Sequence, residues 1–277
     1  MTFTTIQKAK KETRLSYLGN VNKSAKLAKN GKINHQYTYA IYLAPAKTSG
    51  YNVCSHSTPE CRLGCLATSG RAGMEITAGK TKTSSCRNKK VRLFYEQPEY
   101  FMAWAIAEIK YYHDKAIKDG YYYSVRLNCT SDIDWQNVLV NGKNIFEIFP
   151  DVQFYDYTKN PAKFNNIASN YHLTFSYTGR NWLLCEALLK SGHTVAMVFK
   201  IKNENELPKK YKGYPVVNGD ITDYRVDDSK GIIIGLKWKR IANKIAEKQI
   251  LQSCFVIQPN DINCEYASVN VQEEALV

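Results

Sequence analysis

The stretch PEYFMAWAIAEIKYYHDKAIKDGYYYSVRL, residues 98–127, contains a long helix followed directly by a strand. Pro98 occupies the first turn, where proline is tolerated, and apolar side chains recur every three or four residues as far as Ala116. Gly120 is a typical helix stop, and the aromatic-rich segment Tyr121–Leu127 is typical of a strand. Residues 98–127 therefore predict one helix–strand unit of an α/β fold.

The same alternation extends in both directions from this unit. Residues 1–36 are polar and predict an N-terminal arm, which precedes a single domain over residues 37–277. Parallel neighbours in a sheet need a crossover connection, so strands separated by helices or long loops predict a mostly parallel sheet. The further predicted strands are Tyr37–Leu43, Val152–Tyr157, His172–Ser176, Thr194–Lys200, Tyr214–Asn218 and Gly231–Leu236.

Composition limits the class of protein. The 277 residues are 44% hydrophobic, which is enough to bury a sizeable core. No apolar run reaches the roughly 20 residues of a membrane span, and the lysine-rich N-terminus lacks the apolar core of a signal peptide. We therefore expect a soluble, cytoplasmic protein, in an infected host cell if the chain is viral.

The net charge of +13 favours association with polyanions. Residues 80–92 carry six basic side chains and no acidic one. This run predicts a nucleic acid or nucleotide partner that is bound through phosphates, and the alternative is a basic face without a partner. The six side chains are Lys80, Lys82, Arg87, Lys89, Lys90 and Arg92.

A cysteine loop, residues 44–73, follows the first predicted strand. Cys54, Cys61 and Cys65 lie in it with the spacing C-x6-C-x3-C. Thiolates are soft ligands that suit an iron–sulfur cluster or zinc. The short gap places Cys61 and Cys65 one helical turn apart on the same face. The loop therefore predicts a metal centre, with a [4Fe–4S] cluster favoured over zinc.

Zinc and unligated thiols are the alternatives for this loop. Structural zinc sites normally use four ligands in two closely spaced pairs. Cys86 and His56 are the candidates for a fourth ligand, and neither has zinc-finger spacing. A cluster on three cysteines would instead leave one iron open for a substrate or cofactor.

Polar side chains also follow the other predicted strands. Because the carboxyl ends of parallel strands lie at one edge of a sheet, these side chains should meet the cysteine loop there. Asp132 is a candidate general acid or base, and the alternative is that it caps the segment after it. Lys159 would contact an anion or form an ion pair with Asp132 or Asp220, and Asp220 is the third catalytic candidate. The candidates for holding a cofactor are Ser131, Asp134 and Ser176.

Several motifs together resemble a bacteriophage protein family known as gene product eighty-eight. They occur in collinear order over roughly residues 36–240. The resemblance implies a phage-encoded protein whose reaction is not established and which is similar to iron–sulfur barrel proteins. The motifs are Lys47–Cys54, Thr68–Arg71, Arg126–Asn128, Thr130–Trp135, Phe154–Lys159, Leu173–Ser176 and Val216–Asp220, together with Asp223 and Arg225.

The position of the cysteine loop after the first strand also resembles the radical S-adenosylmethionine enzymes. This resemblance implies a TIM-like or partial (β/α) barrel, and it suggests S-adenosylmethionine as a second cofactor. The spacing in that family is C-x3-C-x2-C, and its second strand leads into a glycine-rich segment; here Thr130–Trp135 occupies that place. An open, doubly wound sheet is the competing architecture, although no G-x-G-x-x-G follows the first strand.

Two functions follow from these observations. The first is an iron–sulfur enzyme of phage type with a radical-S-adenosylmethionine-like barrel and an unknown substrate. The second is a non-catalytic nucleic-acid-binding protein in which zinc or a cluster stabilises the loop.

Overall fold

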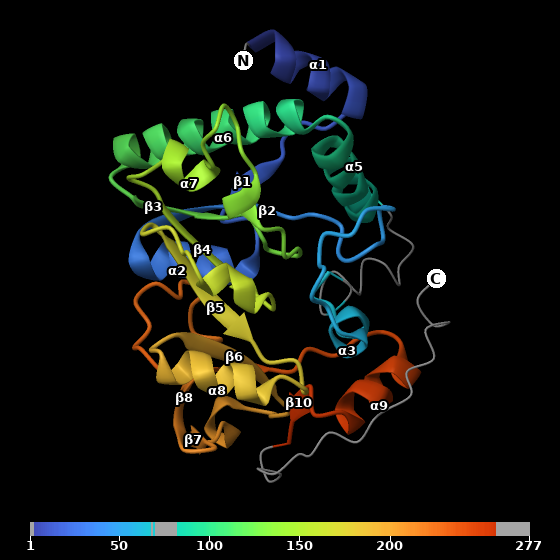
Figure 1. The fold of residues 1–277 in the computed structure, drawn as a ribbon, viewed down its shortest axis with the longest axis vertical. Helices are drawn as coiled ribbons and strands as arrows, with labels where there is room; N and C mark the ends of the chain where they lie inside the picture. The colour runs from blue at the N-terminus through green and yellow to red at the C-terminus, as the bar shows by residue number, and fades with distance from the viewer. Residues whose placement is uncertain (1–2, 68, 70–81, 259–277) are drawn as a thin grey trace.

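One mixed β-sheet forms the centre of the computed structural model, which describes residues 3–67, 69 and 82–258 (Figure 1). Ten strands make up the sheet in this part of the chain. They are β1 (Gly19–Val21), β2 (Gln36–Ile41), β3 (Tyr122–Arg126), β4 (Gln153–Thr158), β5 (Tyr171–Ser176), β6 (Thr194–Phe199), β7 (Lys210–Tyr211), β8 (Tyr214–Asn218), β9 (Ile233–Lys237) and β10 (Val256–Ile257).

The strand order is β1-β2-β3-β4-β5-β6-β9-β8-β7, and β10 pairs with β6. Neighbours from β2 through β9 to β8 are parallel, whereas β1 on β2 and β7 on β8 are antiparallel. The predicted TIM-like or partial barrel is therefore wrong: among the described residues the sheet is mixed, and its two end strands do not pair. Both ends carry very short antiparallel strands, an arrangement typical of the edges of open sheets.

The helices connect these strands and cover the sheet. α6 contacts β2 and β3, and α8 contacts β5 and β6. The helices in the described residues are α1 (Phe3–Thr13), α2 (Ala25–Asn34), α3 (Pro59–Leu63), α5 (Lys82–Glu96), α6 (Pro98–Asp119), α7 (Ile145–Ile148), α8 (Trp182–Lys190) and α9 (Lys244–Gln252). Short 3₁₀ turns occur at Trp135–Asn137, Pro161–Phe164 and Glu204–Glu206.

The two faces of the sheet differ in chemistry. Val125 and Phe154 belong to the main apolar core, which also contains buried residues of α5 and α6. Because side chains alternate along a strand, Arg126 and Tyr155 point to the opposite face. There the Arg126 guanidinium lies over the ring of Tyr155, at 5.3 Å from its centroid. The sheet therefore has an apolar face under helices and a polar face that leads into the site.

The strands expected from sequence between residues 37 and 236 are confirmed to within a few residues, as is the helix that begins at Pro98. Residues 1–36, expected as an arm, contain α1, β1 and α2, and β1 extends the sheet through β2. No helix in the described part of the chain has the length and apolar character needed to cross a membrane.

Candidate functional site

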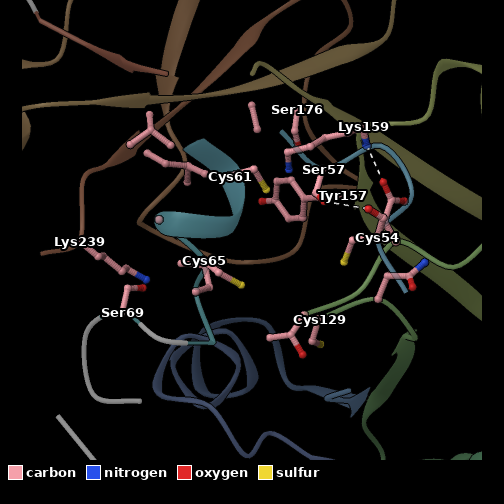
Figure 2. Close-up of a pocket in the computed structure, with 18 of the residues that line it drawn as sticks. Cys54, Ser57, Cys61, Cys65, Ser69, Cys129, Tyr157, Lys159, Ser176 and Lys239 are labelled. Carbon is pink, nitrogen blue, oxygen red and sulfur yellow. Dashed lines mark hydrogen bonds between the residues drawn. The ribbon is translucent and has the colours of Figure 1, made fainter. Parts of the chain in front are cut away.

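A cavity of about 260 Å³ lies where the carboxyl ends of the parallel strands meet the cysteine loop. Side chains from α2, α3 and the segments after β3, β4, β5 and β8 line it. Figure 2 shows the thiols of Cys54, Cys61 and Cys65 facing this space, with Tyr157 and Cys129 at its border. The sequence therefore predicted correctly that the loop and several strand ends share one cavity.

The helix α3 presents Cys61 to this cavity. Thr58 caps it by accepting the Cys61 N–H at 3.3 Å, and Pro59 occupies its first turn. Glu60 is buried and forms an ion pair with Arg180 from the segment after β5. Gly64 ends the helix against the Trp238 ring, where an added Cβ would lie 3.2 Å from the ring. The spacing between Cys61 and Cys65 thus depends on local packing that a larger residue at 64 would disturb.

The segment after β3 holds the start of the loop. The Asp132 N–H donates to the Val53 carbonyl at 2.7 Å, and the Thr130 hydroxyl donates to the Leu43 carbonyl at 2.6 Å. These bonds connect the residues next to Cys54 to the carboxyl end of the second parallel strand. Cys54 is therefore positioned by the sheet.

Two of the three thiols already accept backbone hydrogen bonds. The Ala46 N–H lies 3.5 Å from the Cys54 sulfur, and the Ala67 N–H lies 3.5 Å from the Cys65 sulfur. Burial raises the pKa of Cys54, and it raises the pKa of Cys65 to about 11. The thiols of Cys54 and Cys65 are therefore neutral at pH 7 unless a cation or metal centre stabilises the thiolate.

Within the described residues, no three His, Cys, Asp or Glu side chains are grouped closely enough to hold a single metal ion. Cys86 is on α5 and packs against the main core, and His56 is exposed, with its ring 3.0 Å from the Ser55 hydroxyl. Neither lines the cavity. The two residues considered from sequence as fourth zinc ligands are therefore not brought to the three thiols.

Asp132 lines the cavity but also joins two loops. Its carboxylate accepts from the Thr158 hydroxyl at 2.7 Å and the Lys159 N–H at 2.9 Å. It also pairs with the Lys163 ammonium at 2.6 Å, and Lys163 is only 1% exposed. These three donors make Asp132 a buried connection between the segments after β3 and β4.

Lys159 is directed into the cavity, toward Cys61 (Figure 2). Burial lowers its pKa, but attraction to Cys61 and Asp132 outweighs this effect and the pKa is raised. The side chain is therefore a cation beside the thiols. The sequence predicted that Lys159 either contacts an anion or forms an ion pair with Asp132 or Asp220. Its ammonium faces the thiols, and Lys163 forms the ion pair with Asp132.

The cofactor candidates divide into two groups. Ser131 and Ser176 line the cavity, and the Ser131 hydroxyl also bonds the Asn128 side chain at 2.9 Å. Asp134 does not line the cavity, and its carboxylate accepts from the Asn137 amide at 2.7 Å. Asp134 immediately precedes the 3₁₀ helix Trp135–Asn137, and its side chain is directed toward that helix and not into the cavity.

Asp220 lines the opposite side of the cavity as part of a charged network. Its carboxylate accepts the Lys237 N–H at 2.7 Å and lies 3.5 Å from the Lys26 ammonium. Lys26 is also 3.6 Å from Asp223, which pairs in turn with Arg126. The network connects α2 to the segment between β8 and β9, across the polar face of the sheet.

Lining residues that were not among the sequence candidates for the site include Lys26, Arg126, Cys129 and Tyr157. Arg126 belongs to β3 and Tyr157 belongs to β4, whereas the sequence candidates were chosen from the segments that follow the strands. The signal that could have found these two residues is the alternation of their side chains with apolar neighbours. Burial raises the pKa of Cys129 to about 12, so its thiol is neutral.

The described part of the basic run after the loop, residues 82–92, contains both buried and exposed basic side chains. Lys80 lies outside the described residues. Lys90 is buried, with its ammonium 2.5 Å from the Leu18 carbonyl, and Arg87 lies over the Tyr42 ring. Lys82 and Arg92 are exposed. The described part of the run therefore gives no specific indication of a nucleic-acid partner.

Comparison with known proteins gives a family match. A family model described as gene product 88 matches residues 8–254, which confirms the family that the sequence motifs resembled. No curated protein and no solved structure matches the chain.

Proposed function

The chain belongs to the gene product 88 family, and we propose that it is an iron–sulfur enzyme whose [4Fe–4S] cluster is held by Cys54, Cys61 and Cys65. One observation carries the proposal: these three thiols, from a single loop, face one cavity at the carboxyl ends of parallel strands. Ligand-binding sites in α/β sheets are concentrated at this edge. A cluster there would be next to substrate space.

The donor set fits a cluster better than a single zinc ion. The sulfur atoms of a tetrahedral zinc site lie about 3.8 Å apart and number up to four. In the described part of the chain, no three His, Cys, Asp or Glu side chains form a group that could hold a single metal ion. A cluster contains several irons, so it bridges thiolates that are spaced around a larger cavity.

The surroundings of the thiols support thiolate ligation. Lys159 contributes a positive charge beside Cys61, which offsets part of the negative charge of a cluster with three thiolates. The N–H groups of Ala46 and Ala67 hydrogen-bond two of the sulfurs, and such bonds tune cluster potentials. A [4Fe–4S] cluster on three cysteines supplies an electron-transfer centre with one iron available to a small molecule.

This proposal is tested by purifying the protein without oxygen. We expect a brown protein with about four iron and four sulfide per chain, whose visible absorbance falls on reduction with dithionite. Electron paramagnetic resonance of the reduced protein should show a cluster signal. Addition of S-adenosylmethionine to that sample asks whether this molecule reaches the open iron.

A colourless protein, or one zinc per chain with no sulfide, would refute the cluster. One zinc per chain with no sulfide would support the alternative expected from sequence, a metal-stabilised nucleic-acid-binding protein. The alternative makes its own prediction, because affinity for nucleic acid would fall steeply with salt.

A further inference from the structure

Four residues that line the cavity have a buried polar side-chain atom without a hydrogen-bond partner among the described residues: Ser69, Arg126, Tyr157 and Trp238. Two of these atoms, Nε of Arg126 and the hydroxyl of Tyr157, come from the neighbouring strands β3 and β4, which form the floor of the cavity. Arg126 is only 8% exposed, and the carboxylate of Asp156 is 3.9 Å from its Nε, too far for a hydrogen bond. Buried polar groups are usually satisfied, so the pair indicates a ligand that bonds both.

The Arg126 guanidinium is held in one orientation. Asp223 pairs with one of its terminal nitrogens, and the rings of Tyr155 and Tyr157 lie on it at 5.3 Å each. A guanidinium fixed in this way is suited to carboxylate or phosphate oxygens, because its N–H groups form a planar fork. The unpartnered Tyr157 hydroxyl beside it can donate a further hydrogen bond.

The charge of the lining favours an anion. The described lining has five basic and three acidic side chains. One of the acids, Asp132, is already neutralised by Lys163, which lies outside the lining. The basic side chains are Lys26, Arg126, Lys159, Lys237 and Lys239, and the acidic ones are Asp132, Asp220 and Asp223.

The neighbouring wall is mainly apolar, apart from the buried indole N–H of Trp238, which has no partner among the described residues. Val198, Leu236 and Trp238 line it, together with Phe255. The cavity of about 260 Å³ is suited to a small molecule. A ligand that matches both walls has one oxyanion group and a compact apolar body.

We infer that the floor of the cavity binds a small organic oxyanion, a carboxylate or phosphate with an apolar body, through Arg126 and Tyr157. That this molecule is the substrate rests on the proposed cluster; the binding itself does not. The ligand would be held between the strand β4 and the cysteine loop.

Calorimetric titration of the anaerobically purified protein tests this inference, with iron measured on the same sample. The probes are phenylacetate, phenyl phosphate and the neutral phenylacetamide. We expect at least one of the two anions to bind, and the tighter one identifies the class of oxyanion. We expect phenylacetamide to bind at least about tenfold more weakly, because hydrogen bonds to charged groups are the stronger ones.

Tyr157→Phe removes only a hydroxyl that makes no bond in the described part of the chain, and we expect it to weaken binding about threefold to thirtyfold. Tyr155→Phe is the matched control. It changes the same strand and a ring at the same distance from Arg126, but Tyr155 does not line the cavity, so binding should be unchanged.

Three results would overturn the inference: no binding of either anion, equal binding of phenylacetamide, or equal effects of the two tyrosine variants. Binding by a sample without iron would support the anion site and refute the proposed cluster. Protein that contains iron but binds neither anion would refute the anion site and leave the proposed cluster supported.

Discussion

Two buried polar clusters in this protein differ in how completely they are satisfied. In the glutamate cluster, Glu108 of α6 accepts from the N–H groups of Leu18 and Gly19 and from the Tyr39 hydroxyl, at 2.7–3.1 Å. Lys90 completes it by donating to the Leu18 carbonyl. In the arginine–tyrosine cluster, defined as Arg126, Asp223, Tyr155 and Tyr157, the Arg126 Nε and both tyrosine hydroxyls have no partner in the described chain, and Arg126 and Tyr157 line the cavity.

The difference separates polar groups that hold the fold from those that await a ligand. The glutamate cluster connects the N-terminal segment to α5 and α6, and its donors and acceptors meet one another. The arginine–tyrosine cluster borders a cavity, and its residues Arg126 and Tyr157 have hydrogen-bonding groups that no described residue satisfies. Changes in the first should affect stability, whereas changes in the second should affect binding.

Glu108→Ala should have the largest effect on stability. It leaves buried N–H groups and the Tyr39 hydroxyl without their acceptor, and we expect a loss of about 4 kcal/mol in the free energy of unfolding, measured in urea. Glu99→Ala, on the exposed first turn of the same helix, is the control and should cost less than about 1 kcal/mol. Equal losses in the two variants would show that the glutamate cluster does not hold the fold.

The pH dependence of stability provides a second test of the glutamate cluster. Burial lowers the pKa of Lys90 to about 8 from its ordinary 10.5. Between these values the unfolded chain binds a proton that the folded chain does not, so stability should fall as the pH falls from about 10.5 to about 8. Below about pH 8 this contribution is constant, and the total change is about 3 kcal/mol.

The measurement is the difference between the wild-type protein and Lys90→Met in urea unfolding across this pH range, which cancels other titrating groups. Parallel curves for the two proteins would contradict the lowered pKa.

Asp132→Asn tests whether Asp132 holds two loops together. The change leaves Lys163 buried without its counter-charge, and we expect a loss of about 2 kcal/mol in the free energy of unfolding. Asp134→Asn, two residues away, keeps an oxygen that can accept from the Asn137 amide and removes no ion pair, so it should be close to neutral. An Asp132→Asn variant that is as stable as wild type would contradict the role of Asp132 in holding the two loops together.

Tyr157→Phe should have the smallest effect on stability. Its hydroxyl has no partner among the described residues, so its removal should change the free energy of unfolding by less than about 1 kcal/mol. A loss of more than about 2 kcal/mol would show that this hydroxyl is satisfied within the protein and would place it with the glutamate cluster.

Much of the fold could be predicted because strand and helix signals are local. Residues 98–127 carry a proline start, a glycine stop and an aromatic strand, and all three lie where expected. Whether the sheet closes depends on pairing between distant edges. β1 has three residues and β7 has two, so neither carries a readable pattern. These two short strands make the sheet mixed and open.

The site was predictable where it lies at strand ends. The cysteines, Asp132, Lys159, Ser176 and Asp220 all reach the cavity, because parallel strands end at one edge. Asp134 does not, since the direction of a loop residue depends on turns that sequence spacing leaves open. Arg126 and Tyr157 come from within strands. Cys129 lies outside the cysteine loop in the sequence, yet its side chain borders the same space.

The central claim, that Cys54, Cys61 and Cys65 hold an iron–sulfur cluster, is tested most directly by the iron and sulfide content of cysteine variants purified without oxygen. We predict that each of the three Cys→Ala changes lowers both contents by more than about half, while Cys86→Ala, which lies outside the cavity, keeps the wild-type values. Circular dichroism would confirm that every variant is folded. Iron and sulfide that are absent from the wild-type protein, or that are unchanged in all four variants, would contradict the account.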